Sequence, residues 1–152
     1  MSMRTGAALL RVATAWLALV IAPDCGAGAA DGAAERNFRL HCMGCHQADG
    51  SGSPQQGVPD LRREVGLFLR VPGGRAYLSQ VPGALNTSLD DAQTAGVLNW
   101  VVRNIAQEGA PPDFVPYTAA DVAQFRRTVP ADILADRASL LALVRKTLGA
   151  EH

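Results

Sequence analysis

Apolar residues along this chain recur mainly at the spacing of α-helices. The clearest stretch is residues 89–106, where an apolar stripe repeats every three or four positions. The stripe consists of Val97, Trp100, Val101 and Ile105. Ser88, with Asp91 three positions later, predicts a capping box at the start of this helix. Gly96 lies beside the stripe and would let another helix, such as one that carries Ala34, approach closely.

Three shorter helices are predicted before this one. Residues 30–40 should form the first, with Asp31 as its N-cap and Phe38 facing inward. Residues 61–70 should form the second, and residues 74–80 should form a further helical turn. The apolar residues that the second helix should bury are Leu61, Val65, Phe68 and Leu69. The pattern therefore predicts an all-α fold.

Two more helices are expected after residues 109–112, which have the composition of a linker. Thr118 and Asp121 form a second capping box, which predicts a helix over residues 118–127. Residues 133–148 carry another apolar stripe at helical spacing, and Gly149 should end that helix. The stripe consists of Ile133, Leu134, Leu140, Leu141, Val144 and Leu148. A stripe of this kind is expected to cover the core, and a docking face for a partner is the alternative.

The amino terminus has the pattern of a secretory signal peptide. Residues 1–11 contain two arginines and no acidic residue, and residues 12–22 are mostly apolar. Ala27-Gly28-Ala29 matches an A-x-A cleavage site. The apolar run is too short to span a bilayer comfortably, so we expect no stable membrane span after cleavage and a periplasmic protein.

Charge and length narrow the classes of function. The 152 residues include 14 basic and 14 acidic ones, and this balance does not provide the basic face that nucleic-acid binding needs. Apart from Lys146, every basic residue is arginine, so a lysine-rich docking rim is excluded. We predict three parts: a signal peptide at residues 1–29, a core at 30–109, and a two-helix extension at 110–152 that packs on the core.

The sequence Cys42-Met43-Gly44-Cys45-His46 carries the strongest chemical signal in the chain. Two thiols three positions apart can each add to a vinyl group on one edge of a porphyrin, and the imidazole that follows can reach the iron. The motif predicts one covalently bound haem c, with Cys42 and Cys45 as attachment points and His46 as the proximal iron ligand.

Two other uses of paired thiols fit less well. A structural zinc site needs about four ligands, and the remaining residues of the right kind are Cys25, His41 and His152. A thioredoxin-like dithiol would need strands around the motif, and the pattern does not provide them. Cys25 lies within the predicted signal peptide, and Pro23-Asp24 before it does not suit a lipoprotein signal.

The residues after the motif should surround the proximal side of the haem. Residues 47–59 are rich in glycine, serine and proline, which is typical of a loop. Pro59 is expected to bring its carbonyl or ring near His46, because a ligating histidine needs a backbone acceptor for its free N–H. Four arginines follow, and one of them could pair with a haem propionate. They are Arg62, Arg63, Arg70 and Arg75. Tyr77 is expected to be a packing residue.

Together these features resemble the small bacterial class I cytochrome c family. The resemblance rests on the motif from Cys42 to His46, on Phe38 four residues before it, and on the aromatic-bearing helix at 89–106. It covers roughly residues 30–107 and implies a helical core around one haem, with the first and last core helices crossing.

The sequence departs from this family at the sixth iron ligand. The family usually places a methionine, often followed by proline, just before the last core helix, and Val81-Pro82 stands there in this chain. Beyond the predicted signal peptide the chain has only Met43, which lies inside the attachment motif and cannot reach the other haem face. Asn86 is a candidate weak ligand, although a capping or turn role is favoured for it. We expect an open or weakly filled sixth site.

Three functions remain in view. The favoured one is a periplasmic mono-haem electron carrier whose redox partner is a dehydrogenase or another cytochrome. An alternative is a sensor or carrier of a small ligand at an open iron site. A third is a haem subunit held to a larger dehydrogenase through residues 133–148. An enzyme in its own right is not expected, because Arg75 and His41, the candidate acid/base groups, have no defined placement.

Overall fold

The computed structural model describes residues 26–107 and 109–149. The described residues form eight α-helices and one 3-10 helix: α1 (Gly26–His41), α2 (Met43–His46), η1 (Pro54–Gln56), α3 (Leu61–Phe68), α4 (Gly74–Gln80), α5 (Pro82–Leu85), α6 (Asp91–Asn104), α7 (Ala119–Arg126) and α8 (Ile133–Leu148). The only β feature among them is an isolated bridge between Ser53 and Val58. The predicted all-α fold is confirmed. Most of the predicted signal peptide lies outside the described residues.

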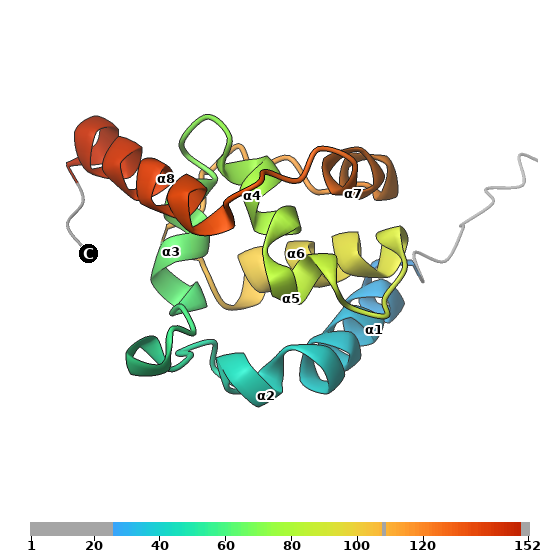
Figure 1. Ribbon diagram of the computed structural model, residues 1–152. Coiled ribbons are helices and arrows are strands. Elements are labelled where there is room, and N and C mark those ends of the chain that lie inside the picture. Colours follow the sequence, from blue (N-terminus) through green and yellow to red (C-terminus); the bar gives the residue numbers. More distant parts are fainter. Residues whose placement is uncertain (1–25, 108, 150–152) are drawn as a thin grey trace, which may run out of the picture.

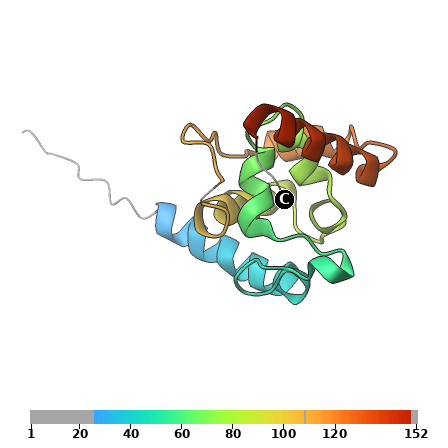
Figure 2. The same cartoon turned by 90° about the vertical axis from the view of Figure 1, so that its left-hand side faces the viewer.

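Two groups of helices face each other across the molecule. Figures 1 and 2 show α1 and α2 along one side, and α7 and α8 along the opposite side, with α6 between them. None of the helices in the described part of the chain is both long enough and apolar enough to cross a membrane.

The predicted crossing of the first and last core helices is present. A Cβ atom placed on Gly96 of α6 would lie 3.8 Å from the Cβ atom of Ala34 on α1, so the two backbones approach closely. Phe38 is 1% exposed, and its ring centroid lies 5.1 Å from that of Trp100. Arg103 at the end of α6 pairs with Asp31 of α1.

Two predicted helix starts were wrong. Asp31 lies inside α1, which begins at Gly26, and it forms an interhelical ion pair instead of an N-cap. The capping box of α6 uses Asp90 and Gln93 instead of Ser88 and Asp91. Asp90 accepts a hydrogen bond from the Gln93 N–H at 2.8 Å, and the Gln93 side chain accepts one from the Asp90 N–H at 3.1 Å. Both pairs satisfy the same sequence pattern, so spacing alone could not choose between them.

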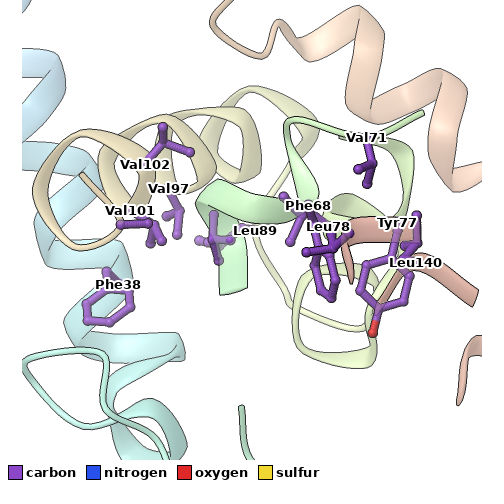
Figure 3. Close-up of a cluster of buried hydrophobic side chains, with 13 residues drawn as sticks. Phe38, Phe68, Val71, Tyr77, Leu78, Leu89, Val97, Val101, Val102 and Leu140 are labelled. Carbon is purple, nitrogen blue, oxygen red and sulfur yellow. The ribbon is translucent and has the colours of Figure 1, made fainter. Parts of the chain in front are cut away.

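The buried core joins α1, α3, α4, α6 and α8 (Figure 3). Phe38 of α1 lies beside Val101 of α6, while Phe68, Tyr77 and Leu140 gather where α3, α4 and α8 meet. The remaining members of the cluster are Val65, Val71, Leu78, Leu89, Val97, Val102, Ala106 and Val144. Tyr77 is a packing residue as predicted, with its ring edge-on to Phe68 at 5.4 Å.

Residues 110–149 pack closely on the other helices. The predicted capping box of Thr118 and Asp121 starts α7, and Gly149 ends α8, as expected. Tyr117 is buried, and its hydroxyl donates a hydrogen bond to the carbonyl of Arg75 at 2.9 Å. The Arg75 guanidinium donates in turn to the carbonyls of Val115 and Pro116 and pairs with Asp121. On α8, Leu140 and Val144 are buried, and Ile133, Leu141 and Leu148 pack partly buried against the core. Leu134 was expected in the same stripe but is 73% exposed, so only part of the predicted stripe covers the core.

Gly66→Ala tests how tightly α3 packs on the chain that follows α6. A Cβ atom on Gly66 would lie 2.2 Å from the Gly109 carbonyl carbon and 2.4 Å from the Ala110 nitrogen. These are backbone atoms that cannot rotate away, so we expect overpacking to lower the free energy of unfolding by ~1–3 kcal/mol in a urea titration.

Gly32→Ala is the matched control for this prediction. Its Cβ atom would meet only the flexible end of the Arg36 side chain, at 3.7 Å. Alanine also favours the helix, so this variant should be as stable as the parent or slightly more stable. Equal stability of the Gly66 and Gly32 variants would contradict the packing described here.

Candidate haem site

The three residues of the predicted site lie where α1 ends and α2 begins, with Cys42 as the N-cap of α2. α1 delivers the chain to Cys42, whose N–H donates to the carbonyl of Phe38 at 2.9 Å. The N–H groups of Cys45 and His46 both donate back to the Cys42 carbonyl, at 3.2 and 3.0 Å. This turn brings the two thiols and the imidazole together, because residues three and four apart share one face of a helix.

Both cysteines are free thiols in the structure, and they differ in burial. Cys42 is half-buried and packs on the core, whereas Cys45 is exposed. Burial raises the pKa of the Cys42 thiol, and the neighbouring Cys45 adds to this effect. The two thiols thus have different environments, one against the core and one at the surface.

The imidazole of His46 is held by a backbone acceptor. Its Nδ1 lies 3.3 Å from the carbonyl oxygen of Pro59, which confirms the predicted contact. When Nδ1 donates this hydrogen bond, Nε2 is left without a proton and can bind a metal. Burial lowers the pKa of His46, although the Pro59 carbonyl opposes that shift, and the neutral ring is the form that ligates iron.

The loop between His46 and Pro59 folds back on itself to make this contact. The N–H of Gly52 donates to the His46 carbonyl at 2.9 Å. Gly52 has φ +64°, and a Cβ atom there would lie 2.3 Å from the Pro59 carbonyl oxygen. The Pro59 oxygen can thus approach the imidazole only because residue 52 has no side chain. Sequence analysis placed Gly52 in a loop but missed this role, because composition does not reveal a positive φ or a close contact seven residues away.

The surroundings of the motif fit a porphyrin. Cys42 and Met43, within the motif, pack on the core but keep part of their surface exposed. A flat apolar macrocycle would cover such surface. The donor set also fits: two thiols on one helical turn, and an imidazole with one nitrogen held and the other available.

Apart from His46, the histidine and lysine residues and Asn86 are exposed or lie outside the described residues. Asn86 is exposed at the end of α5, where its N–H donates to the Pro82 carbonyl at 3.0 Å. His41 at the end of α1 and Lys146 on α8 are exposed as well. His152 lies outside the described residues. The structure therefore places Asn86 as the residue that ends a short helix, while its role toward iron stays a prediction.

Two of the four arginines considered as propionate partners are already paired. Arg62 contacts the carboxylates of Asp60 and Asp49 next to the proximal loop. Arg75 is bound to the segment that leads into α7. Arg63 and Arg70 are exposed.

Comparisons with known proteins indicate the family of this chain. Cytochrome c-552 from Thermus thermophilus is 30% identical over 131 aligned residues, which cover 73% of this chain and 97% of that protein. A second cytochrome c-552, from a particular strain of Thermus thermophilus, is also 30% identical over 131 residues and is covered to 86%. No protein-family model matches the chain, and no solved structure matches it significantly. The length and coverage of these alignments show that the chain belongs to the cytochrome c family.

Proposed function

We propose that this protein is a periplasmic electron-transfer cytochrome with one haem c, attached through Cys42 and Cys45 and ligated on its proximal side by His46. Membership of the cytochrome c family supports the general function, electron transfer by a haem protein. One observation supports the assignment of the three haem-binding residues. A single turn carries both thiols and an imidazole whose Nδ1 lies 3.3 Å from the Pro59 carbonyl.

The residues around the site have separate tasks in this proposal. Bound haem iron supplies one-electron chemistry by alternating between its ferric and ferrous states. The Pro59 carbonyl orients the His46 ring and makes its ligating nitrogen more basic. Phe38, which is 1% exposed, supports the turn that carries the thiols and helps to exclude water. A preorganised site of this kind limits the rearrangement that each electron transfer requires.

We further propose that residues 81–88, here called the distal segment, cover the haem face opposite His46. The segment contains α5, which Figures 1 and 2 place on the side of the molecule that faces α2. The resemblance in sequence also aligns Val81-Pro82 with the position of the usual methionine ligand. Met43 lies in α2, one position from the attachment residue Cys42, and cannot serve the opposite face.

The distal side without methionine has two functional consequences. Methionine ligation raises the reduction potential of a haem, so its loss predicts a lower potential for this carrier. It also favours a second candidate function, the binding of a small molecule at an open sixth site. Carbon monoxide added to the reduced protein separates the two functions, because a changed absorption spectrum requires an accessible iron, whereas an unchanged spectrum excludes ligand binding.

Location and partner are inferred from sequence and charge. The basic and apolar pattern of residues 1–29 supports export to the periplasm. The partner proposed is a redox protein, either a dehydrogenase or another cytochrome. α8 already buries Leu140 and Val144 in the core, which argues against its use as the main contact with a larger subunit. We propose instead that residues 110–152 are an extension that completes the core formed by residues 30–109.

Met43→Leu tests the proposed ligand set. The exported holoprotein should show one reversible one-electron couple in spectroelectrochemistry. Because leucine keeps the size of the side chain but removes its sulfur, we expect neither the absorption spectrum nor the potential of the variant to change. A large shift of the potential on loss of this sulfur would mean that Met43 ligates iron, and an irreversible couple would contradict the proposed electron transfer.

Gly52→Ala tests the role of the Pro59 carbonyl. The new Cβ atom would push this carbonyl away from Nδ1 of His46. A less basic imidazole stabilises the ferric state less, so the reduction potential should rise. The measurement is the same redox titration, together with the chemical shift of the His46 ring proton in the reduced protein.

Gly57→Ala is the matched control in the same loop. Gly57 also has a positive φ, +80°, but a Cβ atom there would meet nothing within 4 Å. Both variants bear comparable backbone strain, and only the change at Gly52 reaches Pro59. The same rise of potential in both variants would refute the assigned role of this contact.

A further inference from the structure

The end of α7 reaches across to the chain that joins α5 to α6. Arg126, the last residue of α7, donates from Nη1 to the carboxylate of Asp91 at 2.5 Å. Its Nη2 donates to the Ala84 carbonyl and to the Thr94 hydroxyl, each at 3.1 Å, and lies 3.5 Å from the Leu89 carbonyl. One guanidinium thus spans from α5 to the first turns of α6.

A second side chain, that of Gln80, connects the start of the distal segment to the end of α7. Gln80, the last residue of α4, is 6% exposed. Its side-chain amide donates to the carbonyls of Phe125 and Thr128, both at 2.9 Å. Gln80 directly precedes the distal segment, and Leu89 directly follows it. The end of α7 therefore contacts both ends of residues 81–88.

Between these two anchors the backbone hydrogen bonds of the distal segment are local. The N–H groups of Ala84 and Leu85 donate to the Val81 carbonyl, and that of Asn86 donates to the Pro82 carbonyl. Pro82, Gly83, Asn86 and Ser88 are exposed. A single helical turn is marginal by itself, so its position depends on what holds its ends.

The Arg126 contacts are made in a partly buried setting where their loss is costly. The side chains of Arg126 and Asp91 are 22% and 36% exposed. Nε of Arg126 is buried and, within the described residues, has no hydrogen-bond partner. Removal of the guanidinium would leave the carboxylate and the carbonyls with fewer partners, which is a larger penalty than the loss of a surface ion pair.

We propose that Arg126 and Gln80 form a latch through which α7 sets the position of the distal segment over the haem. Arg126 is a positioning residue, since it acts through the segment and not on the iron. The inference rests on the proposed function, which assigns residues 81–88 to the distal side. Through this latch the extension at residues 110–152 contributes to the redox site, although it is far from the attachment motif in the sequence.

Arg126→Gln tests the latch in the full-length holoprotein. The probe is imidazole, a bulky ligand that must displace the distal segment to bind ferric iron. A weaker latch lowers the cost of opening, so we expect imidazole to bind about tenfold more tightly, equivalent to ~1.4 kcal/mol. Arg126→Lys keeps the charge beside Asp91 but cannot reach all the acceptors, and it should fall between the parent and Arg126→Gln.

The neighbouring exposed residue provides the control. Arg127→Gln removes the same charge one position later on an exposed side chain, and it should leave imidazole affinity unchanged. A lower melting temperature for Arg126→Gln with unchanged imidazole affinity would show a purely structural role and overturn the proposal.

Hydrogen exchange in the holoprotein without any substitution gives a test that does not require a variant to fold. If the latch couples the two elements, the amides of Leu85 and Asn86 in and after α5 and that of Thr128 after α7 should exchange with one shared opening free energy. Independent opening of these amides would overturn the latch. A purified protein without a haem spectrum would instead refute the proposed function, so the two failures are distinguishable.

Discussion

The geometry of this protein depends on how one imidazole is held. In the proposed site His46 offers Nε2 to iron, and the Pro59 carbonyl, 3.3 Å from Nδ1, fixes the orientation of the ring. The contact requires residues 47–59 to turn back sharply, and Gly52 makes the turn possible because a side chain there would collide with the same carbonyl. A few backbone dihedral angles in one loop thus determine the proximal side of the site.

The remaining helices keep this loop and the motif in place. The crossing of α1 and α6 fixes the helix that leads into Cys42, through Phe38 and Trp100. On the opposite side of the molecule, α8 shares the core with α3 and α4, and α7 packs on α6 and α4. Because the core and the extension have common buried residues, we consider the last forty or so residues to be part of the structure that supports electron transfer, not an appendage.

Local features of the fold were predictable from sequence, and long-range contacts were not. The helices, the Thr118 capping box and the contact between Pro59 and His46 follow from short-range patterns and from the needs of a ligating histidine. The cap assigned to Asp31 failed because α1 begins earlier, at Gly26. The cap assigned to Ser88 failed because Asp90 and Gln93 fit the same pattern two positions later. Arg126 meets Asp91 from 35 positions away, a contact that no periodicity reveals.

The central claim is that one haem is covalently bonded to Cys42 and Cys45. Peptide mapping of the exported protein tests this claim most directly. Trypsin should release residues 40–62 as one peptide, bounded by Arg39 and Arg62, that contains Cys42, Cys45 and His46. We predict that mass spectrometry finds the mass of one haem on this peptide and that neither cysteine reacts with a thiol reagent. A haem-free peptide with two alkylated cysteines would contradict the account.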